Sequence, residues 1–224
     1  MQKGWVMKDC RKHIKTVIVE DHALTRIVLK QMCESYSNIS VCADFDNAED
    51  ALVYVIENSV DLVILDMWLS KMNGIEASKY LKNKFPNLKV IMLVSNIEKQ
   101  EVLASAFSSA DAFMLRDTDL YRLSKIIGKI FEGKFWFDYR IIHSVFNWAN
   151  LLPKSEYSLF YNLLTALEAD IISKVIKGVE KEEIALHWNV EKDEFSFAIN
   201  SIFNKLAKTD TAKQMLRRIR YDLF

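Results

Sequence analysis

The chain has 224 residues, which is the length of one large domain or of two small ones. Half of these residues are hydrophobic, so the chain can bury a sizeable core, and its 5 glycines and 2 prolines are too few for long disordered linkers. The formal net charge is zero, so no overall attraction draws the chain to DNA or to membranes, and any nucleic-acid surface has to be local.

The first residues, MQKGWVMKDCRKHIK, are basic but lack the apolar core of a secretion signal. No later stretch is both apolar and long enough to span a bilayer. The cysteines, Cys10, Cys33 and Cys42, form an odd set without a pattern, which is typical of reduced thiols. We therefore expect a cytoplasmic protein with no membrane partner.

Short apolar runs alternate with segments of helical period between about residues 14 and 134. Each run is too short for a typical helix, and most are rich in Val, Ile or Leu, which is the pattern of parallel strands that are buried on both faces. The predicted strands are 16–20, 39–43, 61–66, 88–95 and 111–116.

The segments between these runs carry apolar residues at helical spacing. The two clearest helical faces gather Ala48, Ala51, Leu52, Val55 and Ile56, and Leu120, Leu123, Ile126, Ile127 and Ile130. Asn47 and Thr118 are the predicted N-caps of these two helices. Five such β-α units predict a doubly wound α/β domain, flavodoxin-like, over residues 14–134.

The rest of the chain has a different pattern. Residues 135–163 are aromatic and less periodic, and we interpret them as a linker with helical pieces. From residue 164 to residue 224 the pattern is helical, and Gly178 and the HWNV step at 187–190 divide it into short helices. The predicted organisation is therefore an α/β domain, a linker and an all-α domain.

Polar side chains follow the predicted strands, at the edge where a doubly wound sheet holds its ligands. Glu20 and Asp21 close the first strand, and Asp66 closes the third. Ser95 and Arg116 close the fourth and the fifth. Three carboxylates at one edge repel one another unless a cation lies among them, and oxygen ligands favour Mg²⁺. One carboxylate can then attack a phosphoryl donor, although the alternative is that Asp66 only caps a helix.

The pattern VIVEDH…LVILDMWLSKMNG…IMLVS…AFMLRD resembles the receiver domain of two-component response regulators. The resemblance implies that Asp66 is the phosphoacceptor and that a sensor histidine kinase supplies the phosphoryl group. It implies that Mg²⁺ is bound by four groups, which are the side chains of Glu20, Asp21 and Asp66 and the backbone carbonyl of Trp68. It also implies switch or phosphate-contacting roles for Ser95, Phe113 and Arg116, of which Phe113 would be the aromatic switch.

Two residues depart from the receiver pattern. Arg116 stands where the family has lysine, and it keeps the charge and can fork onto phosphate, but it is bulkier. Ser70 stands where the family usually has proline, in the loop after the acceptor. Asn73 and Gly74 match the turn that ends this loop. The acid cluster is therefore intact, whereas two of its neighbours differ.

The segment 164–212 resembles the four-helix helix-turn-helix domain of the LuxR/NarL type. The positions in register are mostly core positions, and Gly178 suits the turn between the first two helices. They are Leu164, Thr165, Glu168, Val175, Gly178, Glu183, Ile184, Ala185, Trp188, Val190, Phe195, Ile199, Ile202, Lys205 and Leu206. Four of them, Phe195, Ile199, Ile202 and Leu206, are predicted to form one buried stripe.

In that family the recognition helix lies in the major groove of DNA. The resemblance implies DNA contacts from Lys192, Ser196, Asn200, Asn204, Lys205 and Lys208. Residues 180–194, however, carry six acids against two lysines, which opposes binding to phosphates. Phe197 lies on the same side and either contacts a partner protein or packs on the linker. The basic end of the chain, from 205 to 220, could hold backbone phosphate, be a solvated surface or face the acidic helix across a dimer.

We predict a DNA-binding response regulator, a homodimer at promoter DNA, which is not an enzyme. The alternative is an atypical regulator of the same fold that acts through protein contacts or independently of phosphorylation. An aspartyl phosphatase would need a second acid two residues after the nucleophile, where this chain has Trp68.

Overall fold

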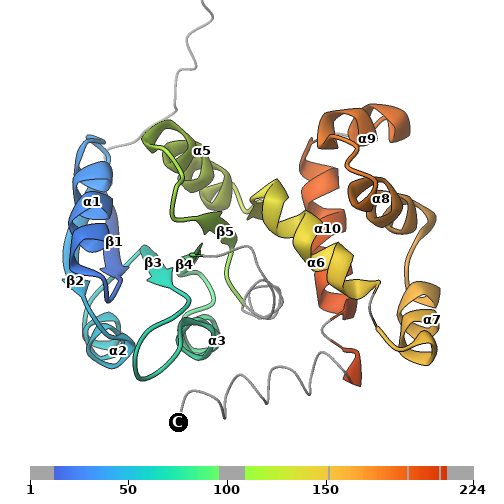
Figure 1. Cartoon of the computed structure of the whole chain (residues 1–224). Helices are drawn as coiled ribbons and strands as arrows, with labels where there is room; N and C mark the ends of the chain where they lie inside the picture. Colours follow the sequence, from blue (N-terminus) through green and yellow to red (C-terminus); the bar gives the residue numbers. More distant parts are fainter. Residues whose placement is uncertain (1–12, 96–108, 151, 191, 207, 211–224) are drawn as a thin grey trace, which may run out of the picture.

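The computed structural model of the chain describes residues 13–95, 109–150, 152–190, 192–206 and 208–210 (Figure 1). Its centre is a parallel six-stranded sheet with the strand order β2-β1-β3-β4-β5-β6. The strands are β1 (Ile14–Val19), β2 (Ile39–Phe45), β3 (Leu62–Asp66), β4 (Lys89–Val94), β5 (Ala112–Leu115) and β6 (Trp136–Phe137). The first five strands lie where the apolar runs predict them.

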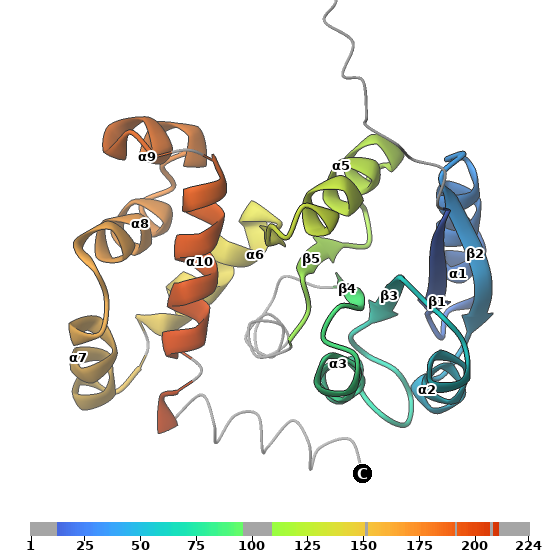
Figure 2. The ribbon, with the colours of Figure 1, turned by 180° about the vertical axis from the view of Figure 1, so that it is seen from behind.

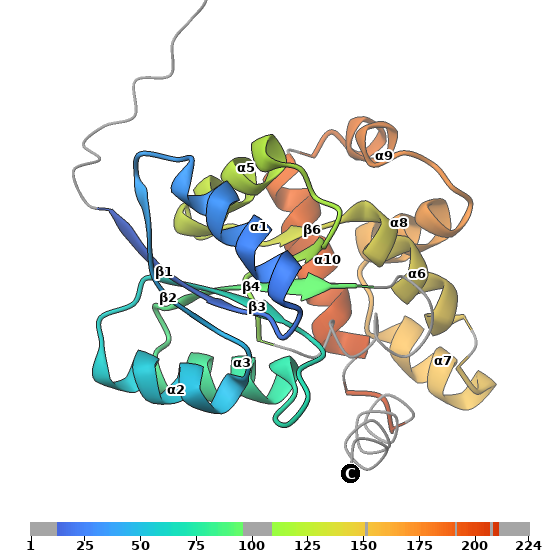
Figure 3. The same ribbon diagram turned by 60° about the vertical axis from the view of Figure 1, so that its left-hand side comes forward.

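Helices cover both faces of this sheet. Figure 3 shows α1 (Ala23–Glu34) and α5 (Leu120–Phe131) on one face, and α2 (Ala48–Glu57) and α3 (Gly74–Lys84) on the other. Along β1, the side chain of Val17 joins the core under α2 and α3, and that of Ile18 joins the core under α1 and α5. Both faces of the inner strands β1, β3, β4 and β5 are buried, which explains why these strands are largely apolar runs, whereas the edge strand β2 is mostly half-buried. The predicted flavodoxin-like fold is confirmed.

The two predicted helix caps have different outcomes. Asn47 caps α2, because its side chain accepts a hydrogen bond from the backbone N–H of Asp50. The prediction of Thr118 as the cap of α5 is wrong, because Asp119 occupies that position and accepts from the backbone N–H of Arg122 at 2.8 Å. The backbone N–H of Thr118 instead closes a turn to the carbonyl of Leu115, and its hydroxyl is buried. The helix therefore begins one residue later than predicted.

The second half of the chain is helical. Its helices are α6 (Tyr139–Ala149), α7 (Lys154–Asn162), α8 (Ala166–Ile176), α9 (Lys181–Trp188) and α10 (Lys192–Leu206). Figure 2 shows that they gather beside the β5 end of the sheet. The stretch 135–163, predicted to be a linker, contributes β6, α6 and α7. The division at residues 134 and 163 remains a prediction.

The cores of the two halves are continuous. Phe195, Ile199, Ile202 and Leu206 form the predicted buried stripe of α10, and they belong to the same apolar cluster as Val17 under α2 and α3. Gly178 follows α8 with a φ of 76°, a left-handed conformation that glycine adopts without strain. Among the described residues, no helix is both long and apolar enough to cross a membrane.

Candidate functional site

Three carboxylates meet at the carboxyl ends of β1 and β3. Val19 and Leu65 are partners in the parallel pairing of these strands, so the next residues, Glu20 and Asp66, emerge side by side. One oxygen of each of Glu20, Asp21 and Asp66 lies within 4.8 Å of the others. Glu20 and Asp66 are fully buried, whereas Asp21 is exposed. The strand order thus brings together residues that are far apart in the sequence.

Arg116, which follows β5, reaches across to this cluster. Its Nη2 lies 2.9 Å from Glu20 Oε1 and 2.8 Å from Asp66 Oδ2, so one guanidinium bridges both buried carboxylates. Asp66 Oδ2 also accepts a hydrogen bond from the backbone N–H of Trp68 at 3.2 Å. The Arg116 side chain is 28% exposed, which leaves the bridge open to solvent on one side. The guanidinium offsets only one of the three negative charges.

The second oxygen of each buried carboxylate has no partner in the described structure. Glu20 Oε2 and Asp66 Oδ1 are both buried and accept no hydrogen bond. Buried carboxylate oxygens without a partner are costly, and a bound cation would supply a partner to both. A hard divalent cation with oxygen ligands suits this donor set, and Mg²⁺ fits the residues present.

Burial governs the pKa values of the two buried acids. Burial and the nearby charge of Asp66 raise the pKa of Glu20 to about 7. Burial also raises the pKa of Asp66 to about 6, although the charge and hydrogen bond of Arg116 oppose the shift. Burial of Arg116 lowers its pKa, but the neighbouring carboxylates raise it further, so the net shift is upward and the guanidinium stays charged. Without a metal, the cluster favours protonated acids at a pH where free carboxyls are ionised.

We expect Asp66→Asn to raise the free energy of unfolding by roughly 1–3 kcal/mol at pH 7.5 without metal. The folded state binds the Asp66 proton more tightly than the unfolded state, because the folded pKa of about 6 lies above that of a free carboxyl. Ionised Asp66 therefore destabilises the folded wild type, and this loss is absent below pH of about 4 and grows as pH rises through about 6. Asparagine does not ionise, so the variant avoids the loss. Urea unfolding of both proteins at pH 4 and pH 7.5 measures it. An equal gain at both pH values would contradict this cause.

Hydrogen bonds that do not involve the Asp66 carboxylate fix the loop after this residue. Asn73 caps α3, because its side chain accepts from the backbone N–H of Glu76 at 2.9 Å. The backbone N–H of Gly74 donates to the carbonyl of Met67 at 2.9 Å. The alternative that Asp66 only caps a helix is therefore wrong, because Asn73 caps the helix that follows and the Asp66 carboxylate turns to Arg116. Glu49 of α2 also holds this loop, by accepting from the backbone N–H of Met72.

The other predicted receiver residues lie around this rim. Ser95 directly follows β4 and is exposed. Trp68 is half-buried in the loop, and its indole N–H is buried and finds no hydrogen-bond partner among the described residues. Phe113 in β5 is only 2% exposed and stacks on Phe137 of β6. The functional roles of these residues remain predictions.

The predicted DNA-contacting residues are distributed along α10 and just beyond it. Asn204 and Lys208 are exposed, and Asn200 is half-buried. Lys205 donates to the buried Glu168 of α8 at 2.6 Å, so its charge is already paired. For Lys192 and Ser196 only the backbone in α10 is described, and the basic residues from 211 onward lie outside the described residues.

Phe197 packs on the predicted linker, and the alternative of a partner-protein contact stays a prediction. It packs edge-to-face on Phe135, at 6.1 Å between ring centroids, as the linker-packing alternative expects. It is nevertheless 51% exposed, so part of the ring remains available on the surface.

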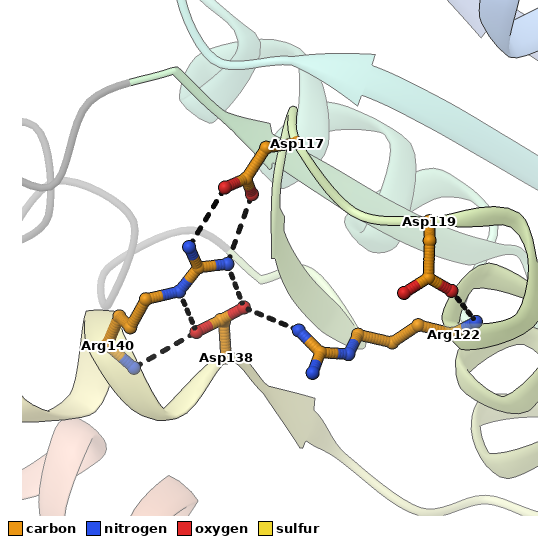
Figure 4. A network of polar contacts seen from close by, with 5 residues as sticks. All are labelled: Asp117, Asp119, Arg122, Asp138 and Arg140. Atoms are coloured by element: carbon orange, nitrogen blue, oxygen red, sulfur yellow. Dashed lines mark hydrogen bonds and ion pairs between the residues drawn. The ribbon is translucent and has the colours of Figure 1, made fainter.

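A polar network beside the site was not found from the sequence. Figure 4 shows Asp117, the residue after Arg116, paired with Arg140 of α6, which also binds Asp138. Asp117 and Arg140 are 23 residues apart and lie in segments without a periodic pattern. The only signal is the cluster of opposite charges in the two short segments, which does not by itself predict a contact.

A known protein family matches the part of the sequence that carries this site. The model for the response regulator receiver domain matches residues 16–128, just over half of the chain, and the match includes all three clustered carboxylates and Arg116. The chain belongs to the response regulator family. The matched range of this regulator includes the rim residues described above.

Similarity to known regulators extends over almost the whole length. The response regulator protein VraR of Staphylococcus saprophyticus is 27% identical over 210 residues, which cover 94% of this chain and 98% of that protein. VraR of Staphylococcus aureus is 25% identical over the same length. The predicted assignment to two-component response regulators of the NarL/LuxR type is confirmed.

Solved structures share the fold of both halves. The response regulator ChrA of a heme-sensing two-component system aligns with a TM-score of 0.54 and 18% identity, covering 95% of this chain and 99% of that one. A structure of two RcsB dimers bound to two parallel DNAs aligns with a TM-score of 0.56 and 17% identity, covering 93% of this chain and 98% of that one. The helical half of this regulator thus has the arrangement found in full-length regulators.

Proposed function

We propose that this response regulator accepts a phosphoryl group on Asp66 from a sensor histidine kinase, with Mg²⁺ bound at Glu20, Asp21, Asp66 and the carbonyl of Trp68. The observation that supports this most is the gathering of three carboxylate oxygens within 4.8 Å, two of them on buried residues that each keep an unpartnered oxygen. The proposed output is transcription control by a homodimer at promoter DNA.

Each residue of the rim has a task in this proposal. Asp66 would attack phosphorus through an oxygen, and its Oδ1 accepts no hydrogen bond in the described structure. Arg116 already contacts Oδ2 of Asp66 and would keep its positive charge beside the transferred phosphoryl group. The hydroxyl of Ser95, at the end of β4, would contact the phosphoryl oxygens. Mg²⁺, when bound, supplies positive charge against the carboxylates and those oxygens.

The helical half supports DNA binding through its arrangement rather than through its charge. Asn204 near the end of α10 and Lys208 just after this helix are both exposed, which supports DNA contacts from this end of the proposed recognition helix. RcsB, whose fold is shared, is bound to DNA as dimers in the structure described above. DNA binding by this chain would therefore depend on few cations, and we expect it to be weak without phosphorylation.

A DNA titration tests the output. Treatment with Mg²⁺ and acetyl phosphate should tighten binding to duplex DNA by roughly 5-fold or more. Because lysines neutralise phosphates, affinity should fall between about 50 mM and about 200 mM salt. Lys208→Ala should weaken binding and lower the salt slope by about 1, whereas Lys154→Ala, in the first turn of α7, should leave both unchanged. Fluorescence anisotropy of labelled DNA measures both quantities.

A second candidate function is control through protein contacts. The first turn of α9 carries Glu182 and Glu183, which would repel DNA phosphates, and Lys205 is paired with Glu168. The half-exposed ring of Phe197 is a suitable contact for a partner protein. Weak binding with a salt slope near zero, before and after acetyl phosphate, would favour this candidate over DNA binding.

A further inference from the structure

The segment between the two halves is fixed to the sheet rather than free. Its strand β6 pairs in parallel with β5, with Phe113 and Phe137 as register partners. The backbone N–H of Trp136 donates to the carbonyl of Asp111, and that of Asp138 donates to the carbonyl of Phe113. The first turn of α6 therefore starts from a position that β5 determines.

Stacked aromatic rings hold Phe113 inward. Its ring lies 5.1 Å from that of Phe137 at an interplanar angle of 7°, and Phe137 in turn meets Phe203 of α10 edge-on at 4.9 Å. Phe113 and Phe137 are only 2% and 9% exposed. Rotating Phe113 outward would break the stack and leave a cavity under β6, which is costly in a packed core. A signal that moves this ring would have to disrupt its stacking on Phe137.

Ion pairs beside the aromatic stack form a second connection between the end of β5 and α6. Arg140 of α6 binds Asp117 through two nitrogens, at 2.9 and 3.0 Å, and binds Asp138 at 3.0 Å (Figure 4). Such a two-pronged pair fixes direction as well as distance. Arg122 contributes less, because it approaches Asp138 only to 3.8 Å, which is beyond hydrogen-bond distance.

This connection starts at the phosphoacceptor rim. Arg116, which contacts Asp66, and Asp117, which contacts Arg140, are consecutive residues. They form the middle of a tight turn that is closed by a 3.0 Å hydrogen bond from the backbone N–H of Thr118 to the carbonyl of Leu115. Because the two residues share one peptide unit in a closed turn, a shift of the Arg116 backbone displaces Asp117.

The connection ends on the output helices. Tyr139, the first residue of α6 and the neighbour of Arg140, donates its hydroxyl hydrogen bond to the carbonyl of Val179, which lies between α8 and α9. Further along α6, Phe146 packs edge-to-face on Phe203 of α10 at 6.1 Å. A displacement of α6 at Arg140 therefore reaches both the α8–α9 turn and α10.

We infer that the Asp117–Arg140 pair, rather than rotation of Phe113, carries the state of the Asp66 rim to the C-terminal helices. Asp117 and Arg140 are positioning residues in this inference, and neither contacts the phosphoacceptor. The inference rests on the proposed phosphorylation of Asp66, because it needs a ligand at that rim that moves Arg116.

Hydrogen–deuterium exchange of the full chain, with and without Mg²⁺ and beryllium trifluoride, tests it. This phosphomimetic has been used with the receiver of RcsB. In the wild type, exchange should change in residues 62–74, which report the rim, and in 139–149 and 179–190, which report the helices. Asp117→Asn should keep the first change and reduce the second at least three-fold. Asp117→Glu, which retains a carboxylate for Arg140, should restore most of it.

Two control variants separate the pair from its surroundings. Arg122→Gln alters the same network but leaves the Asp117–Arg140 pair in place. Its exchange should change in both sets of residues, as in the wild type. Phe113→Leu cannot act as an aromatic switch, and its exchange should also change in residues 139–149 and 179–190. The inference is overturned if exchange in the helices changes as much in Asp117→Asn as in the wild type, or does not change in Phe113→Leu. It is also overturned if exchange in the wild type changes at 62–74 and not in the helices. No change at 62–74 in the wild type would instead sink the proposed phosphorylation, and this inference with it.

Discussion

Gly74→Ala should lower the free energy of unfolding by roughly 2–4 kcal/mol and slow phosphorylation of Asp66. A Cβ at this position would lie 2.1 Å from the carbonyl oxygen of Asp66 and 3.0 Å from its carbonyl carbon. These atoms belong to the backbone of the end of β3, so no side-chain rotation relieves the overlap. The loop that carries the phosphoacceptor has to move, and both stability and site geometry should suffer.

Gly128→Ala is the matched control for this substitution. Gly128 lies within α5 on an exposed face, and a Cβ there meets nothing within 4 Å. Alanine is the better helix former, so this variant should gain about 0.5–1 kcal/mol. Urea unfolding of the three proteins measures the difference. Similar stabilities for the two variants would show that the close approach of Gly74 to Asp66 does not exist in solution.

Asp66→Asn should reduce phosphorylation by Mg²⁺ and acetyl phosphate by roughly 100-fold or more. An amide oxygen is a poor nucleophile, and asparagine also removes one of the charges that would attract the metal. The side chain is buried and isosteric, and Arg116 keeps Glu20 as its partner, so the variant should still fold. Intact-mass spectrometry measures the fraction that carries a phosphoryl group.

Asp61→Asn serves as the control at the opposite end of the same strand. Asp61 accepts a hydrogen bond from the backbone N–H of Lys15, which asparagine can also accept, and it lies away from the rim. This variant should be labelled like the wild type. Label that persists in Asp66→Asn would mean that another group, such as Asp21, accepts the phosphoryl group.

The inner strands of the receiver half, β1, β3, β4 and β5, could be predicted because both of their faces are buried, which makes each largely an apolar run. The edge strand β2 is half-buried over most of its length. Strand β6 could not be predicted, because its residues, Trp136 and Phe137, lie in an aromatic stretch without a period. The cap of α5 was placed one residue early, since Thr118 and Asp119 are both good caps and only the turn from Leu115 decides between them.

The position of the site followed from strand order, but its detailed contacts did not. Residues at strand ends converge in any doubly wound sheet, so Glu20 and Asp66 could be placed together. That one nitrogen of Arg116 contacts both carboxylates depends on side-chain directions that spacing does not reveal. The Lys205–Glu168 pair joins residues 37 apart, on α10 and α8, and needs the helix packing to be known.

Diffraction from crystals grown with Mn²⁺ would show directly whether the rim holds a divalent ion, because Mn²⁺ prefers the same oxygen ligands as Mg²⁺ and its anomalous scattering marks its position. We predict an anomalous peak at the carboxyl ends of β1 and β3, with Glu20, Asp21 and Asp66 as ligands. A map with no peak there, and with Arg116 still bridging Glu20 and Asp66 at saturating Mn²⁺, would contradict a metal-assisted phosphoacceptor.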